Sequence, residues 1–188
     1  KEKDSKLLKF LATATPADHF RPYCHAFLSF RIKAPIFVAR QLGTSQIGLM
    51  WDSHEGLSWN EVSRRYVDSE PEFYVPNRWR GRPEGNIKQG SNDQEVVGAD
   101  PVLTVILHKT LEAYNELLRL GVAPEMARMV LLLNTMTEWI WSGSLLAFIR
   151  VCKLRCDSHA QEETRFMGNE IKKHLMEHFP NATKAYLE

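Results

Sequence analysis

Residues 58–66 read Ser-Trp-Asn-Glu-Val-Ser-Arg-Arg-Tyr, a segment in which charged and hydroxyl side chains predominate. Its only large apolar side chains are Trp59 and Val62, too few for an amphipathic core segment. The two arginines that follow Ser63 could bind a phosphate through charge-assisted hydrogen bonds, with Asn60 and Glu61 left to contact a polar ring edge. The alternative is a solvated helix start, because the segment's first serine and Glu61 have capping-box spacing.

Length and composition favour a single soluble domain over residues 1–188. Apolar residues make up 44% and charged residues 25% of the chain, which is ordinary for a globular protein. The formal net charge is +1, which argues against non-specific nucleic-acid binding while leaving local anion sites possible.

Three cysteines predict neither a disulfide framework nor a zinc site, because they include no paired Cys-x-x-Cys unit. Buried thiols in a reducing, cytoplasmic setting are the simpler interpretation, and no metal site is expected. No apolar run reaches the roughly 20 residues of a membrane span. The chain begins Lys-Glu-Lys-Asp without an initiator Met, so we expect it to lack its natural N-terminus.

The first half of the chain predicts a helix, a strand and a second helix. Apolar spacing indicates a helix over 5–12. Residues 23–32 are β-branched and aromatic enough for a strand that ends at Lys33-Ala34-Pro35. Pro35 is then expected to open a helix over 36–41, followed by a long loop over 42–58.

The second half predicts helices. Asp100 is expected to cap a helix that ends at Gly121. Two further helices are expected, over residues 124–133 and 135–156. After a cap at Asp157-Ser158, the last helix is expected to bury Phe166, Ile171, Leu175, Met176 and Phe179. Residues 84–99 resemble a flexible connector. An early strand followed by a helical second half predicts a mixed α/β (α+β) fold in which helices dominate.

Arg128 stands out within the second of these helices. It lies among Met126, Ala127, Met129 and Val130. An arginine inside so apolar a turn is expected to have a partner, because an unpaired buried charge is costly.

Four ordered segments resemble the flavin-dependent thymidylate synthases: residues 33–41, 58–66, 127–131 and 154–161. The family signature reads Arg-His-Arg-x-x-Ser-x-Asn-Glu-x-Ser-x-Arg-Tyr. Its second half is matched at Ser58, Asn60, Glu61, Ser63, Arg65 and Tyr66. The resemblance covers nearly everything from about residue 4 to residue 180.

This resemblance implies an α/β fold and a reductive methylation of dUMP to dTMP. In the family, NADPH reduces bound FAD, methylenetetrahydrofolate provides the one-carbon unit for position 5 of uracil, and a hydride from the flavin completes the methyl group. It also implies a homotetramer with active sites at subunit interfaces.

The resemblance places the nucleotide and flavin contacts on particular residues. The expected dUMP contacts are Gln41, Glu61, Ser63, Arg64, Arg65, Arg128 and Arg155. Arg65 would bind the phosphate, Ser63 would lie against the pyrimidine, and Arg155 would stabilise an ionised uracil ring, so Ser63 and Arg155 are the catalytic candidates. The expected FAD contacts are His19, Asn60, Ser144, Arg150 and His159.

The chain departs from the family in the Arg-His-Arg half of the signature. Counted forward from Gln41, those places hold Thr44, Ser45 and Gln46; counted back from residue 58, they hold Ser53, His54 and Glu55. Ser144 and Arg150 also stand where the family has asparagines. Arg150, Arg78, Arg80 or Arg82 could substitute for the missing cations near the flavin phosphates.

Two other functions stay open. One is a related enzyme that hydroxymethylates dUMP at C5, and the other is a nucleotide-binding tetramer that has lost catalysis. A DNA-binding module fits least, given the near-neutral charge.

Overall fold

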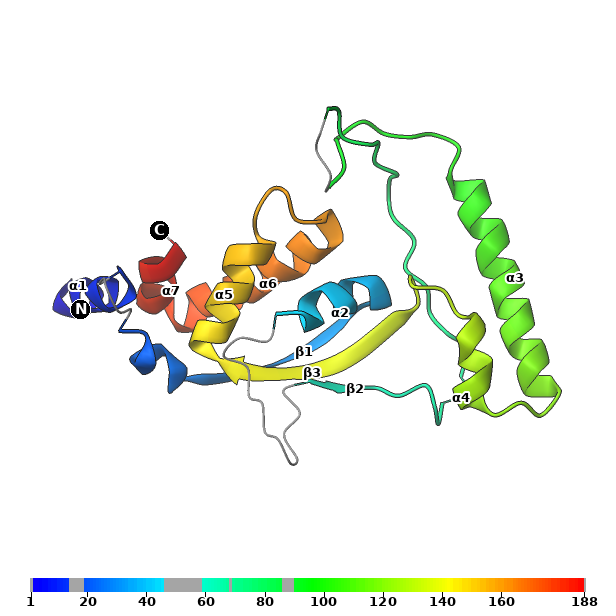
Figure 1. Cartoon of the computed structure of the whole chain (residues 1–188), viewed down its shortest axis with the longest axis horizontal. Coiled ribbons are helices and arrows are strands. Elements are labelled where there is room, and N and C mark those ends of the chain that lie inside the picture. The colour runs from blue at the N-terminus through cyan, green and yellow to red at the C-terminus, as the bar shows by residue number, and fades with distance from the viewer. Residues whose placement is uncertain (1, 14–18, 46–58, 68, 86–89, 188) are drawn as a thin grey trace. The chain divides into compact units, whose positions relative to one another are not determined.

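The computed structural model describes residues 2–13, 19–45, 59–67, 69–85 and 90–187 (Figure 1). The chain forms two compact units. Unit 1 comprises Lys1–Phe30, Gln41–Asn60 and Ile140–Glu188, and unit 2 comprises Arg31–Arg40 and Glu61–Trp139. The single domain expected from the sequence stays a prediction. Most of the expected 42–58 loop lies outside the described residues.

A three-stranded sheet has the order β1-β3-β2, so β3 is the central strand (Figure 1). The strands are β1 (Phe27–Pro35), β2 (Trp59–Glu61) and β3 (Met136–Ser144). In β1, exposed Arg31 and Lys33 alternate with buried Ile32 and Ala34, as the two-residue period of a strand requires. The helix start considered for residues 58–66 is wrong, because residues 59–61 are extended.

The predicted strand over 23–32 is displaced toward the C-terminus. Arg21–Cys24 form a short 3₁₀ helix, η1, with Pro22 in its first turn. Pro35 was expected to open the next helix but is instead the last residue of β1. A missing backbone N–H is tolerated in an edge strand, and β1 is one in the order β1-β3-β2. The following helix, α2 (Ile36–Gly43), extends two residues beyond its predicted end.

The expected helix over 135–156 is wrong in its first half. Residues 136–144 form β3, and only Leu145–Arg155 are helical, as α5. The sequence Met-Thr-Glu-Trp-Ile-Trp is rich in β-branched and aromatic residues, and it buries Trp139 and Trp141 on one face with Ile140 on the other. The side chain of Ser144 then caps α5 by accepting a hydrogen bond from the Ala147 N–H at 3.2 Å.

Unit 1 also contains the helices α1 (Glu2–Thr13), α6 (Glu162–His178) and α7 (Pro180–Leu187). Trp141, Phe148 and Leu175 are among its fully buried side chains. The predicted last helix begins at Glu162, with Gln161 at the N-cap position in place of Asp157-Ser158. Of its predicted buried residues, Ile171 and Leu175 are confirmed, Met176 and Phe179 are half-buried, and Phe166 is 58% exposed.

Unit 2 contains α3 (Asp100–Arg119), α4 (Pro124–Ala127) and the 3₁₀ helix η2 (Arg128–Val130). Asp100 is the first residue of α3 and not its cap, and its carboxylate accepts a hydrogen bond from the Trp79 indole at 2.7 Å. Gly121 has φ 83°, which suits a residue that ends a helix. The helix predicted over 124–133 ends early, because α4 gives way to η2 after Ala127 and the backbone is extended at Leu131.

Among the described residues, no helix combines the length and the apolar character that a membrane crossing requires.

Candidate active site

Unit 1 contains a cavity of about 180 Å³ between α5 and the end of α2. Its lining residues are Thr44, Ser45, Ala147, Arg150, Val151, Leu154 and Arg155. The α5 residues recur at intervals of three and four, so they lie on one face of that helix. Two hydroxyl residues and two arginines therefore border one space together with three apolar side chains, which suits a ligand that combines an anionic or polar group with an apolar part.

Arg155 is held in place by the end of α2. Its Nη2 donates to the Gln41 carbonyl oxygen at 2.7 Å and to the Thr44 hydroxyl at 3.1 Å. The Ser45 hydroxyl lies 3.5 Å from the same nitrogen. Within the part of the chain that the structure describes, Nε of Arg155 is buried and has no hydrogen-bond partner. The guanidinium is thus fixed at one nitrogen and retains a buried donor without a partner among the described residues, which is energetically costly.

The side chain of Gln41 is directed to α6. Its Nε2 donates to Gln161 Oε1 at 2.5 Å, and its Oε1 accepts from the buried Thr164 hydroxyl at 2.8 Å. Gln41 therefore acts on the cavity mainly through its carbonyl, which holds Arg155.

Gly168 allows α6 to approach α5 closely at Arg155. A Cβ atom at this position would lie 3.0 Å from the Arg155 Cβ and 3.1 Å from its carbonyl carbon. Gly168, Thr44, Ser45 and Thr164 were not among the predicted site residues, because their importance comes from contacts between distant segments. The only sequence signal was the place of Thr44 and Ser45 shortly after Gln41.

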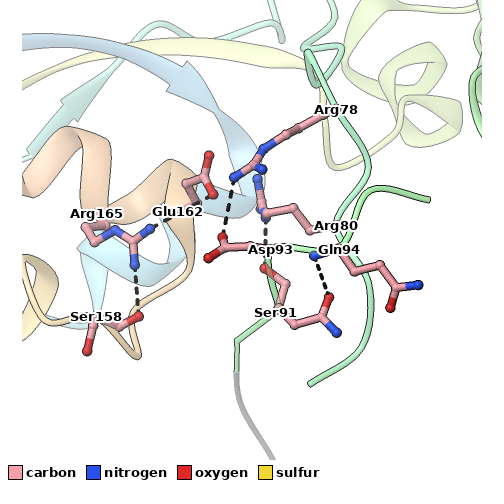
Figure 2. A network of polar contacts seen from close by, with 9 residues as sticks. Arg78, Arg80, Ser91, Asp93, Gln94, Ser158, Glu162 and Arg165 are labelled. Atoms are coloured by element: carbon pink, nitrogen blue, oxygen red, sulfur yellow. Dashed lines mark hydrogen bonds and ion pairs between the residues drawn. The ribbon is translucent and has the colours of Figure 1, made fainter. Parts of the chain in front are cut away.

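His159 lies in the exposed turn after α5. Its backbone N–H and its ring Nδ1 each lie 2.8 Å from Oδ1 of Asp157. These hydrogen bonds, the backbone one first, lower the pKa of the Asp157 carboxyl below its ordinary value. The same turn is tied to α6 by Arg165, which donates to the Ser158 carbonyl at 2.8 Å and lies 3.9 Å from Glu162 (Figure 2).

The other predicted flavin contacts of unit 1 have varied surroundings. Arg150 is exposed and lines the cavity. His19 is exposed and its ring stacks against that of Phe10, with the ring centroids 6.1 Å apart. Asn60 is exposed on β2. Ser144 is buried as the cap of α5. The structure thus brings Arg150 and Arg155 to one cavity, whereas His19, Asn60 and Ser144 do not line it.

In unit 2, the Ser63-Arg64-Arg65 segment presents its two arginines differently. Arg65 is exposed; its Nε donates to the Ser63 hydroxyl at 2.9 Å, and its guanidinium carbon lies 5.3 Å from the Tyr66 ring centroid. Arg64 is half-buried and lies 5.9 Å over the ring of buried Tyr114, while donating to the Ser69 carbonyl. Arg65 is therefore the more accessible of the two for a phosphate.

Two more predicted contacts belong to unit 2. Oε1 of Glu61 accepts from the Thr137 hydroxyl at 2.5 Å. Arg128 is exposed, as are neighbouring Met126 and Met129, and its Nε lies 3.2 Å from the Glu125 carbonyl. Arg128 is therefore not a buried charge, and the partner expected for it is, among the described residues, the Glu125 carbonyl. The convergence of Arg65, Arg128 and Arg155 on one nucleotide stays a prediction, because Arg155 belongs to unit 1.

Arg78 and Arg80, considered as substitutes for the missing cations, are engaged with residues 91–94 (Figure 2). Arg78 lies 3.6 Å from the Asp93 carboxylate. Arg80 Nε donates to the Ser91 hydroxyl at 2.8 Å, and the Gln94 N–H donates to Asn92 Oδ1 at 3.1 Å. These contacts favour a loop-ordering role for both arginines.

Comparison with known proteins agrees with the family resemblance seen in the sequence. The family model for thymidylate synthase complementing protein (Thy1) matches residues 1–181. A flavin-dependent thymidylate synthase of Thermosipho melanesiensis is 32% identical over 190 residues, which cover 100% of this chain and 78% of that protein. One from Thermus thermophilus is 37% identical over 174 residues, covering 90% of this chain and 60% of that protein.

A solved structure has a similar fold. It is a UMP/dUMP methylase, PolB, from Streptomyces cacaoi with 5-Br dUMP bound. The TM-score is 0.77 at 23% identity, and the match covers 98% of this chain and 79% of that one.

Proposed function

This chain belongs to the thymidylate synthase complementing protein family, and we propose that it catalyses the reductive methylation of dUMP to dTMP. The relatives' names support methylation of a uracil nucleotide and a flavin cofactor. The proposed carbon donor is methylenetetrahydrofolate and the proposed reductant is NADPH. The observation that carries the proposal is the fixed guanidinium of Arg155 beside the cavity of unit 1, with its buried Nε without a partner among the described residues.

Arg155 is the proposed catalytic cation. Methylation at C5 requires electron density at that carbon, and negative charge on the uracil ring increases it. A cation that is already oriented stabilises such charge without reorganisation during the reaction. The contacts from Gln41 and Thr44 provide this orientation, because they hold one amino group of Arg155.

Arg65 is the proposed phosphate ligand of dUMP. Its exposure leaves room for a phosphate, and Ser63 already orients the guanidinium through Nε. The Ser63 hydroxyl accepts from both the backbone N–H and Nε of Arg65, at 3.3 and 2.9 Å. Because it accepts twice, its own proton can be donated to a uracil oxygen, which supports a contact role for Ser63. Glu61, Arg64 and Arg128 complete the proposed nucleotide contacts.

We propose that the cavity of unit 1 binds part of a flavin nucleotide. Bound FAD would supply hydride chemistry. Arg150, together with the hydroxyls of Thr44 and Ser45, offers donors for a phosphate group, although the family's Arg-His-Arg is absent. His19, Asn60 and His159 are exposed, so they can contact the cofactor directly. Ser144 would act on the cofactor site indirectly, because it caps the N-terminus of α5, and this helix carries Arg150 and Arg155.

The size of this cavity supports a site shared between chains. At about 180 Å³ it is smaller than the roughly 300 Å³ of a typical pocket for a whole ligand. We therefore propose a homotetramer with interface active sites. On α3, the exposed fractions of Val102, Val105 and Ile106 are 67%, 51% and 44%, an apolar surface that a partner chain would cover. The three free cysteines support the proposed cytoplasmic location.

The test is reconstitution of the purified chain with FAD, followed by tritium release from dUMP labelled at C5. We expect a flavin absorbance spectrum, tritium release that requires methylenetetrahydrofolate, and dTMP that forms only with NADPH. Mass spectrometry of the nucleotide product separates methylation from hydroxymethylation. A protein that binds dUMP, takes up no flavin and releases no tritium would contradict the proposal and support a nucleotide-binding function.

A further inference from the structure

The C-terminal turns of α6 carry a group of metal-ligating side chains outside the candidate active site. Ligand atoms of His174, Glu177 and His178 lie within 4.8 Å of one another, and all three side chains are exposed. The spacing of three and four residues places them on one helix face. Among the described residues, they form the only group of three or more such side chains with this proximity. Cysteine spacing gave no indication of it.

The donor set suits a borderline divalent ion. Imidazole nitrogen and carboxylate oxygen bind zinc at about 2.0–2.2 Å, so neighbouring ligand atoms of a tetrahedral site are about 3.4 Å apart. Small rotations of exposed side chains would bring atoms that are within 4.8 Å to that spacing. Water would complete the coordination, as in zinc sites with three protein ligands.

The surroundings favour a cation in two ways. The ring of His174 packs against Phe30 of β1, with centroids 6.0 Å apart, which limits the orientations of one ligand. The cluster also lies at the C-terminus of a 17-residue helix, where the helix dipole attracts positive charge. Lys172 and Lys173 act against this attraction, so we expect moderate affinity.

We propose that His174, Glu177 and His178 bind one divalent transition-metal ion, with zinc as the ion that best fits the donors. The bound ion links the last two turns of α6 next to its junction with α7. At that junction the buried Thr183 hydroxyl donates to the Leu175 carbonyl at 3.2 Å. Metal binding therefore stabilises the α6–α7 corner of unit 1, separately from the proposed catalysis.

Calorimetric titration of the chelator-treated full chain with zinc tests the site. We expect one ion per chain with a dissociation constant in the micromolar range. His178→Ala should weaken binding at least tenfold, and Glu177→Gln should weaken it several-fold. His108→Ala is the matched control, because exposed His108 lies 3.4 Å from Glu112 on α3 and belongs to no group of three such ligands among the described residues. This control should leave the affinity unchanged.

Two further measurements distinguish binding by the histidines from binding by the cysteines. Cobalt titration should give no thiolate charge-transfer band, whereas such a band would assign binding to cysteine and overturn the proposal. Zinc should raise the melting temperature of the wild type by a few degrees and leave that of His178→Ala unchanged. Without metal, both proteins should melt alike, because His178 is exposed. No saturable binding, or unchanged affinity in His178→Ala, would also overturn the proposal.

Discussion

Arg155 and Arg65 are both proposed to act on the same nucleotide, yet their surroundings differ. Arg155 in unit 1 is half-buried and held by the Gln41 carbonyl and the Thr44 hydroxyl from another segment. Arg65 in unit 2 is exposed, and its side chain contacts Ser63 and Tyr66, its near neighbours in the chain. The first orientation depends on tertiary structure, and the second on local sequence.

This difference indicates a division of roles. A cation that stabilises developing charge must be in place before the reaction, and fixed contacts accomplish this. A cation that binds a phosphate can lie on a flexible side chain. The bound phosphate then orients the guanidinium, because it accepts two hydrogen bonds from it. We therefore expect changes around Arg155 to affect turnover and changes at Arg65 to affect affinity.

Arg155→Ala should have the largest effect. We expect kcat to fall about 100- to 1000-fold, as for loss of an oriented charge-stabilising donor, with a less than tenfold change in dUMP affinity. Steady-state kinetics and calorimetric dUMP titration measure the two quantities. Arg155→Lys keeps the positive charge but loses the planar set of guanidinium donors, so it should recover only part of the rate. Equal losses of rate and affinity would contradict the division of roles.

Arg65→Ala should weaken dUMP binding about 10- to 100-fold, which corresponds to the loss of charged hydrogen bonds of about 1.5–3 kcal/mol. At saturating dUMP, kcat should change less than about threefold. Arg119→Ala is the control, since that exposed arginine pairs with Glu116 in its own helix at 2.6 Å. Unchanged affinity in Arg65→Ala would remove the phosphate assignment.

Gly168→Ala tests the packing behind Arg155. The added methyl group would lie 3.0 Å from the Arg155 Cβ, so α5 or α6 must shift, at a cost of about 1–3 kcal/mol in stability. We expect kcat to fall about tenfold when the assay is run well below the melting temperature. Gly43→Ala is the matched control in α2, where an added Cβ meets nothing within 4 Å. A Gly168→Ala enzyme with wild-type kcat would show that the position of Arg155 tolerates movement.

Thr44→Val should have the smallest effect. Its hydroxyl both donates to the Gln41 carbonyl at 2.7 Å and accepts from Arg155 at 3.1 Å. One hydrogen bond contributes about 0.5–1.5 kcal/mol, so kcat should fall about threefold to tenfold while the KM for dUMP changes little. Thr44→Ser keeps the hydroxyl and should restore kcat. If serine and valine behave alike, the hydroxyl does not position Arg155.

The confirmed sequence predictions come from local patterns. The helix ending at Gly121 was predicted because glycine tolerates positive φ, and the structure has that conformation there. The family was identified from ordered motifs, and the Thy1 match confirms it. Local patterns were less reliable over residues 135–156, where Trp139, Ile140 and Trp141 suit a buried helix or strand equally well. Pairing with β1 and β2 decided for the strand.

The sequence by itself determined the family, the mixed α/β class and the residue types available for binding a nucleotide. Tertiary structure alone decided that the Gln41 carbonyl and the Thr44 hydroxyl hold Arg155, and that Gly168 packs against it. It also decided that Arg128 is exposed. The physical reason is that motif spacing and helical period act over a few residues, whereas hydrogen bonds to Arg155 join segments more than a hundred positions apart.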